Sequence, residues 1–87
     1  MRILLAEDDD ALRSVVERGL DEAGYVVDSV ADGKRALDFL STYEYEVVVL
    51  DWRMPELTGL EVLAKMRAAN TMTPVLMLTA RDGPGDR

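Results

Sequence analysis

The chain has 87 residues, 48% of them hydrophobic and 31% charged, and its 17 acidic against 10 basic residues give a net charge of −7. This size and balance are typical of one small globular domain, and the negative charge argues against binding of nucleic acid phosphates. The absence of cysteine and histidine excludes disulfides, zinc–thiolate sites and histidine-based catalytic triads. No apolar run is long enough to cross a membrane or to act as a signal peptide, so we expect a soluble, cytoplasmic protein.

Short apolar runs alternate with stretches of helical periodicity along the whole chain. In chain order, the predicted elements are strand Ile3–Ala6, helix 11–23, strand Tyr25–Val30, helix 34–42, strand Val47–Leu50, helix 60–69 and strand Val75–Leu78. Strand and helix that alternate in this way predict a parallel sheet with helices on both faces, a three-layer α/β/α fold.

Several residues mark the ends of the predicted helices. Asp10 is placed to cap the first helix and Gly24 to follow it. Thr58 and Glu61 have the spacing of a capping box for the third helix, which Asn70 can end. Along that helix, a stripe of side chains recurs on one face: Leu60, Leu63, Ala64 and Arg67.

The chain after the fourth predicted strand is polar and contains glycine and proline, from Arg81 to Arg87. Doubly wound sheets usually carry five or six strands, so we expect residues 1–87 to be one domain that is incomplete at its C-terminus. A last strand with an open apolar edge pairs readily with other strands. The sequence therefore predicts self-association through Val75–Leu78 or through exchange of elements.

Polar side chains follow three of the predicted strands, at the edge of the sheet where ligands bind in this class of fold. Glu7 and Asp8 follow the first strand, Asp51 follows the third and Thr79 follows the fourth. If the first and third strands are neighbours, the three carboxylates converge and need a proton or a cation between them. Carboxylates are preferred ligands of Mg²⁺, and an aspartate beside Mg²⁺ can attack phosphorus while a hydroxyl such as that of Thr79 bonds a phosphoryl oxygen. The pattern predicts a Mg²⁺-dependent phosphoaspartate site.

Each of these residues also has a simpler interpretation when it is taken alone. The acidic run from Glu7 to Asp10 can serve only to cap the helix and to complement its dipole. Asp51 can be a turn former and Thr79 an ordinary strand residue. Only their coincidence at three strand ends favours the phosphoaspartate site.

Several segments together resemble the receiver domain of a two-component response regulator, most closely those of the OmpR-like subfamily with a winged helix downstream. The segments are Ile3–Asp9, Val49–Pro55, Thr58–Gly59 and Val75–Arg81. This resemblance implies a flavodoxin-like fold with strand order 2-1-3-4-5, of which the fifth strand is missing here. It implies a signalling domain that controls transcription through a separate DNA-binding domain, and not an enzyme, although such a domain can assist its own phosphorylation and dephosphorylation.

The resemblance also implies a role for each matching residue. Asp51 would accept the phosphoryl group from a sensor histidine kinase, and Mg²⁺ would be bound by Asp8, by Glu7 through water and by the backbone carbonyl of Arg53. Further roles fall to residues around this centre: Thr79 would bond the phosphoryl group, Ala80 would leave room for its entry, and Pro55 and Gly59 would shape the loop after Asp51. The family also has a Lys at the end of a fifth strand, whereas the lysines here are Lys34 and Lys65, both in predicted helices.

Two other functions are weighed against this one. A phosphatase of the haloacid-dehalogenase kind uses an acid two residues after its nucleophile, and Arg53 at that position cannot donate a proton in the same way. The second alternative is a fragment that is not phosphorylated and acts only by self-association or by competing for a kinase.

Overall fold

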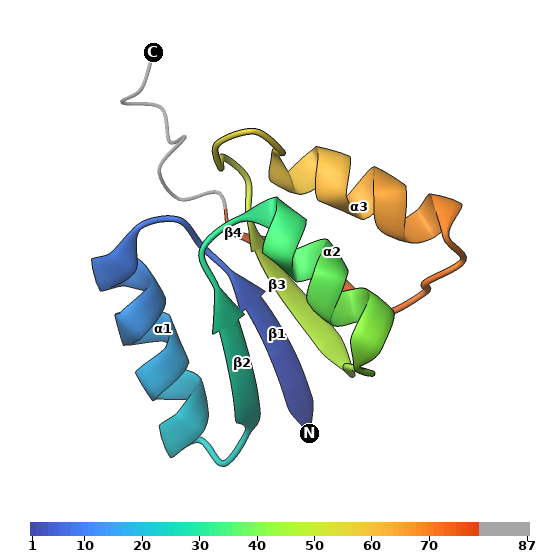
Figure 1. Ribbon diagram of the computed structural model, residues 1–87. Helices are drawn as coiled ribbons and strands as arrows, with labels where there is room; N and C mark the ends of the chain where they lie inside the picture. The colour runs from blue at the N-terminus through green and yellow to red at the C-terminus, as the bar shows by residue number, and fades with distance from the viewer. Residues whose placement is uncertain (79–87) are drawn as a thin grey trace.

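The computed structural model describes residues 1–78, which form four strands and three helices in the predicted order. The elements are β1 (Arg2–Ala6), α1 (Asp10–Glu22), β2 (Val26–Val30), α2 (Gly33–Thr42), β3 (Val47–Asp51), α3 (Gly59–Ala68) and β4 (Val75–Leu78). All neighbouring strands are parallel, in the order β2-β1-β3-β4, which confirms the predicted fold class (Figure 1). None of the described helices is long and apolar enough to span a bilayer.

The central strands β1 and β3 are buried on both faces, as their continuous apolar runs predict. On the face that carries α1, the buried residues are Ile3, Leu5 and Val49. On the face that carries α2 and α3, they are Leu4, Ala6, Val30, Ala36, Tyr45, Val48, Leu50, Met54, Val62 and Met66. The alternation along each strand divides the core between the two faces of the sheet, with helices on both (Figure 1).

Strand register brings the carboxyl ends of β1 and β3 side by side. Ala6 lies opposite Leu50, so the residues that follow them, Glu7 and Asp51, leave the sheet at the same edge. On the other side of β3, the backbone N–H of Trp52 donates to the carbonyl of Leu78 at 3.0 Å. The edge of the sheet is thus fixed on both sides of Asp51.

Most of the predicted helix ends are confirmed, with one correction at α1. Thr58 and Glu61 form the predicted capping box, and Gly24 has the left-handed φ of 97° that a residue after a helix adopts. The cap of α1 is Asp9, whose carboxylate accepts from the backbone N–H of Leu12, and Asp10 is the first residue of the helix. A run of three aspartates lets sequence alone place the cap one residue too late.

The buried face of α3 differs from the predicted stripe of Leu60, Leu63, Ala64 and Arg67. Its buried residues are Gly59, Val62 and Met66, while Leu60 and Ala64 are exposed. The first turn explains the difference, because Gly59 lies against the backbone of Asp51 and sets the rotation of the helix. Positions three and seven residues further on then face the sheet.

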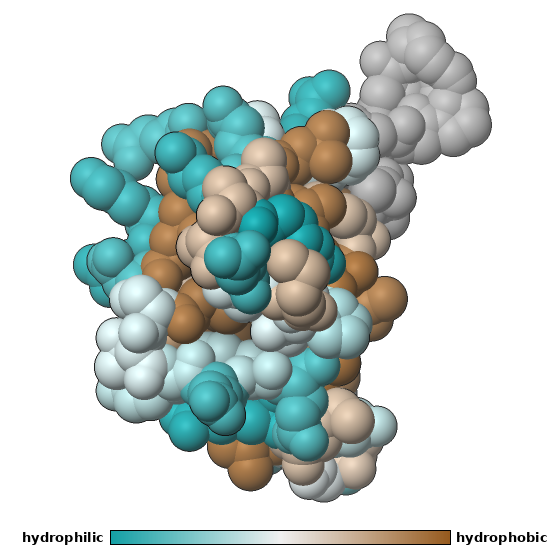
Figure 2. All heavy atoms as spheres, turned by 90° about the vertical axis from the view of Figure 1, so that its right-hand side faces the viewer, coloured by the Kyte–Doolittle hydropathy of each residue, from teal (hydrophilic) through white to brown (hydrophobic). Residues whose placement is uncertain are grey.

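The sheet is incompletely covered at β4 in the part of the chain that is described. Leu76 is 62% exposed, although the apolar run of β4 predicts burial on both faces. Leu12 and Val15 of α1 are also exposed, because α1 packs mainly against β2 and β1. Figure 2, a view onto the side with α3 and β4, shows hydrophobic atoms exposed among hydrophilic ones.

Candidate functional site

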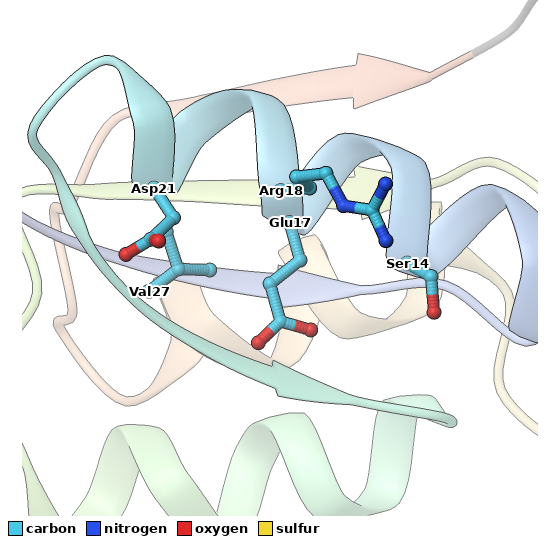
Figure 3. Close-up of a pocket in the computed structure, with 5 residues that line it drawn as sticks. All are labelled: Ser14, Glu17, Arg18, Asp21 and Val27. Atoms are coloured by element: carbon cyan, nitrogen blue, oxygen red, sulfur yellow. The ribbon is translucent and has the colours of Figure 1, made fainter.

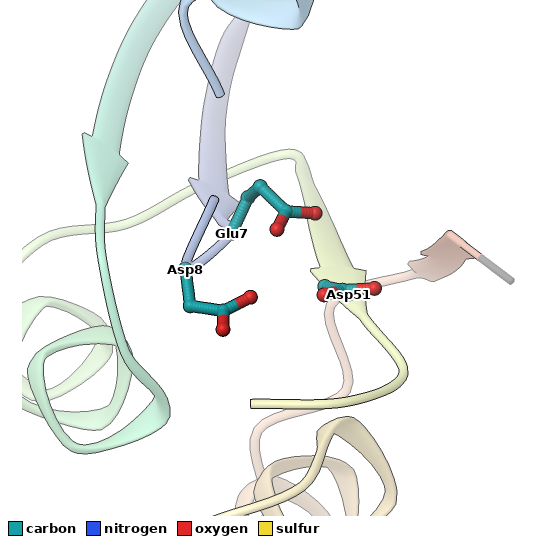
Figure 4. Close-up of side chains that lie close together, drawn as sticks. All are labelled: Glu7, Asp8 and Asp51. Atoms are coloured by element: carbon teal, nitrogen blue, oxygen red, sulfur yellow. The ribbon is translucent and has the colours of Figure 1, made fainter. Parts of the chain in front are cut away.

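Three acidic side chains meet at the carboxyl edge of the sheet. Glu7 and Asp8 follow β1, and Asp51 is the last residue of β3 (Figure 4). One carboxylate oxygen from each residue lies within 4.8 Å of the others. The convergence that the sequence predicts is confirmed.

The three carboxylates are largely buried, so it costs free energy to keep all of them charged. Glu7 is 0% exposed and Asp51 is 2% exposed, and Asp8 is partly buried. Two unit charges about 4.8 Å apart repel each other by about 3–4 kcal/mol at an effective dielectric constant of about 20. Three carboxylates therefore call for a proton or a cation among them.

The donor atoms of the cluster fit a small divalent cation. Mg²⁺ takes six oxygen ligands at about 2.0–2.1 Å, so that opposite ligands lie about 4 Å apart and water fills the remaining positions. The spacing of Glu7, Asp8 and Asp51 is compatible with one shared ion of this kind. The buried Oδ1 of Asp8 forms no hydrogen bond with any of residues 1–78, which leaves it available as a ligand.

The loop after Asp51 is fixed by its own backbone. The N–H of Gly59 donates to the carbonyl of Trp52 at 2.9 Å, which closes the loop. Inside it, the N–H of Leu57 donates to the carbonyl of Pro55 at 2.7 Å across Glu56, which has a left-handed φ of 71°. The expectation that Pro55 and Gly59 shape this loop agrees with these contacts.

Other predicted site residues are placed less fully. Thr79 and Ala80 lie outside the described residues, and their roles stay predictions. Arg53 lies in the loop after Asp51 with an exposed side chain, and the role of its carbonyl as a metal ligand also stays a prediction. Lys34 and Lys65 lie on α2 and α3, as predicted, and both are exposed.

Two residues that support the cluster were not singled out from the sequence. The backbone N–H of Asp9 donates to Oε2 of Glu7 at 2.8 Å. The side chain of Arg13 donates to the backbone carbonyl of Glu7, also at 2.8 Å. The signal for Arg13 was its position three residues after Asp10, a spacing that allows an ion pair in a first helical turn.

A groove on the described surface lies apart from the residues of this cluster. A groove of about 400 Å³ lies between α1 and β2, and it is lined by Ser14, Glu17, Arg18, Asp21 and Val27 (Figure 3). Glu17 already accepts a hydrogen bond from Ser29 at 2.8 Å there. The acidic site is recognised by the convergence of its side chains.

The family model described as "Response regulator receiver domain" matches residues 3–87. The chain belongs to the response regulator receiver family. This match confirms the resemblance drawn from the motifs around Glu7, Asp51 and Thr79. Receiver domains are signalling domains of two-component systems, which bind Mg²⁺ at an acidic site and interact with sensor histidine kinases.

Several relatives that match this chain over one part of their length are transcriptional regulatory proteins. The chain is 44% identical over 87 residues to the transcriptional regulatory protein TcrA of Mycobacterium tuberculosis, and the match covers 100% of this chain and 34% of TcrA. The transcriptional regulatory protein QseB of Haemophilus influenzae is 45% identical over 87 residues, which are 39% of its length. The chain thus spans between about a third and two fifths of the length of these relatives.

Solved receiver domains share the fold closely. The Francisella response regulator 1452 receiver domain superposes with a TM-score of 0.89 at 35% identity, over 98% of this chain and 70% of that one. The receiver domain of the sensor histidine kinase PA1611 of Pseudomonas aeruginosa has a TM-score of 0.88 at 35% identity, over 99% and 72% of the two chains. That protein has a magnesium ion coordinated in its active site cleft.

Proposed function

We propose that this receiver domain accepts a phosphoryl group on Asp51 from a sensor histidine kinase, in a Mg²⁺-dependent step of two-component signalling in the cytoplasm. The observation that carries the proposal is the meeting of Glu7, Asp8 and Asp51 within 4.8 Å at the junction of β1 and β3. By analogy with relatives that are transcriptional regulators, the signal would control transcription through a DNA-binding domain elsewhere in the whole protein.

The chemistry follows from the position of Asp51. A carboxylate oxygen of Asp51 attacks the phosphorus of the donor, the bond from phosphorus to the histidine nitrogen breaks, and an acyl phosphate forms. Mg²⁺ bound by Glu7, Asp8, Asp51 and the Arg53 carbonyl would neutralise charge on the phosphoryl oxygens. Thr79 would bond one phosphoryl oxygen, and the small Ala80 would leave room for the group.

Phosphorylation by a small acyl phosphate tests this proposal without a kinase. The intact mass of the 87-residue chain should rise by one phosphoryl group when Mg²⁺ is present, and removal of Mg²⁺ with a chelator should abolish the gain. The substitution Asp51→Asn should abolish it as well. Asp32→Asn is the matched control, because Asp32 is the cap of α2 and not one of the three clustered carboxylates, and asparagine also caps helices well.

Equal phosphorylation of wild type and Asp51→Asn would overturn the assignment of the acceptor. Equal phosphorylation with and without Mg²⁺ would overturn the cation's part in the reaction. Turnover of a phosphomonoester, with release of inorganic phosphate over many cycles, would favour the phosphatase alternative instead.

We also propose that the 87-residue chain associates with a second copy of itself through β4. At the edge of the described sheet, β4 has backbone N–H and C=O groups on one side that no described strand pairs. Leu76 adds exposed apolar surface at the same place. The β4 of a second copy would supply both backbone partners and apolar contact. The alternative function, a fragment that acts only by self-association, would use this surface.

A further inference from the structure

The loop from β1 to α1 places like charges close together before any cation binds. Its three residues, Glu7 to Asp9, and the first residue of α1, Asp10, are all acidic, and two of the four belong to the cluster with Asp51. Repulsion among them favours conformations in which the loop opens and Glu7 and Asp8 move apart. A site of fixed geometry therefore needs a contact that holds this loop.

Arg13 supplies such a contact from the first turns of α1. Its Nη1 donates to the backbone carbonyl of Glu7 at 2.8 Å, and its Nη2 donates to Oδ1 of Asp10 at 2.6 Å. The planar guanidinium thus joins the end of β1 to the start of α1 across the loop. The side chain of Arg13 is only 20% exposed, whereas that of Asp10 is 86% exposed. The contact with the Glu7 carbonyl is therefore the part-buried half of the bridge, and the contact with Asp10 is open to water.

Glu7 is consequently held at two points. Arg13 fixes its backbone carbonyl, and the N–H of Asp9 fixes its carboxylate through Oε2 at 2.8 Å. Asp8 lies between these two anchors in the sequence, so its position follows from theirs. Arg13 therefore influences the positions of both Glu7 and Asp8. It does so without bonding to their carboxylates, because its two acceptors are the Glu7 carbonyl and the exposed carboxylate of Asp10.

We propose that Arg13 is a positioning residue for the cation site, an inference that rests on the proposed function of the acidic cluster. Arg13 holds the loop from β1 to α1 closed, so that Glu7 and Asp8 keep the arrangement that a divalent cation requires. Support from outside the ligand set is a common feature of metal sites, and its loss typically weakens affinity by about 10- to 100-fold.

The positive charge of Arg13 should weaken cation binding by the cluster, whereas its positioning of the loop should strengthen it. The direction in which the Kd changes when Arg13 is replaced therefore tests the proposal. If Arg13 acted only as a positive charge near the site, its removal would strengthen cation binding. If it positions the loop, its removal weakens cation binding despite the loss of that positive charge. Arg13→Met removes both charge and bridge, while Arg13→Lys keeps the charge but loses the planar fork.

The experiment measures the Kd of Mn²⁺ and Mg²⁺ for the 87-residue chain by titration calorimetry, with no phosphodonor present. We expect Arg13→Met to weaken binding by about 10-fold or more, and Arg13→Lys to weaken it by less. The matched control is Arg18→Met on the same helix, which makes the same change of charge. Arg18 lies beside the groove between α1 and β2 (Figure 3) and forms no hydrogen bond or ion pair within the described structure. The Arg18→Met variant should therefore bind the cation with the wild-type Kd or slightly more tightly.

Urea unfolding of each variant without cation separates affinity from folding, because a merely stabilising role would lower the unfolding midpoint and leave the Kd of the folded protein unchanged. Wild-type or tighter binding by folded Arg13→Met overturns the proposal. If Arg13→Met does not fold, a wild-type Kd for Arg13→Lys overturns it. Failure of wild type itself to bind, or equal binding by Asp8→Asn, instead overturns the proposed function, and the inference about Arg13 with it.

Discussion

Gly59, the first residue of α3, lies close to the carboxyl end of β3. A Cβ at this position would overlap the carbonyl oxygen of Asp51 and would lie 3.1 Å from Sδ of Met77. We expect Gly59→Ala to push α3 and β3 apart, to lower the free energy of unfolding by about 1–3 kcal/mol, and to slow phosphorylation of Asp51.

Gly19→Ala is the control for Gly59→Ala, and both are measured by urea unfolding. Gly19 lies in α1, and a Cβ added there would meet no atom within 4 Å, so alanine should stabilise the protein by up to about 1 kcal/mol. An unchanged unfolding midpoint and phosphorylation rate in Gly59→Ala would show that the contact with Asp51 can relax freely.

Asp28 lies in β2, the edge strand on the other side of the sheet from β4, and its protonation should affect the free energy of unfolding. The Tyr45 hydroxyl donates to its carboxylate at 2.5 Å and Arg2 at 3.0 Å, and these contacts lower the pKa of Asp28 below its usual value of 3.8. Burial and the Asp28 carboxylate in turn raise the pKa of the Tyr45 hydroxyl.

The sign of the effect on stability follows from the lowered pKa of Asp28. The folded state binds this proton less readily than the unfolded state. The contribution is therefore fully present above pH 3.8, and it is lost as the pH falls from there through the lower pKa of the folded state. We expect the cost of Asp28→Asn, measured by urea unfolding, to shrink between about pH 7 and about pH 3. A cost that stays constant over this range would contradict the assignment.

At the scale of the element, the start of α1 offers a direct test of the corrected cap. The carboxylate of Asp9 accepts from the N–H of Leu12 at 3.0 Å, whereas Asp10 lies within the first turn. Asp9→Ala should lower the free energy of unfolding by about 1 kcal/mol. Asp9→Asn, which retains a capping oxygen, should cost less, and equal effects of the two substitutions would count against the cap.

Element identity and order could be predicted from the sequence, because apolar runs and capping residues are local signals. The rotation of α3 could not be predicted, since it depends on the contact between Gly59 and the backbone of Asp51, which the periodicity of the helix does not encode. The exposure of Leu76 was missed for a similar reason. An apolar run shows that a strand can be buried, and only the packing of the helices shows which of its faces are covered.

At the scale of the whole molecule, the edge strand β4 governs the expected association. Leu76→Lys places a charge on the exposed apolar surface of this strand, and charged residues at sheet edges oppose pairing. We expect wild type to form dimers or larger species in sedimentation equilibrium at micromolar concentration, and Leu76→Lys to shift the distribution toward monomer. Met72→Lys is the control, because Met72 is 64% exposed but lies outside the strands. A monomeric wild type would contradict the proposal.

The acidic cluster was predictable because strand order in this fold places the ends of β1 and β3 together, and Glu7, Asp8 and Asp51 stand at those ends. The contacts of Arg13 and Asp9 with Glu7 were not predictable in the same way. They depend on how the loop turns between β1 and α1, and a run of acidic residues does not by itself determine that turn.

The central claim is that this cluster binds one divalent cation, and a Mg²⁺ titration followed by the fluorescence of Trp52 tests it most directly. Trp52 follows Asp51 in the chain and is 37% exposed, so its emission should respond to a cation bound beside it. We predict a saturable change with one ion per chain that is lost in Asp8→Asn and retained in Asp32→Asn. No response in wild type, or the same response in Asp8→Asn, would contradict the account.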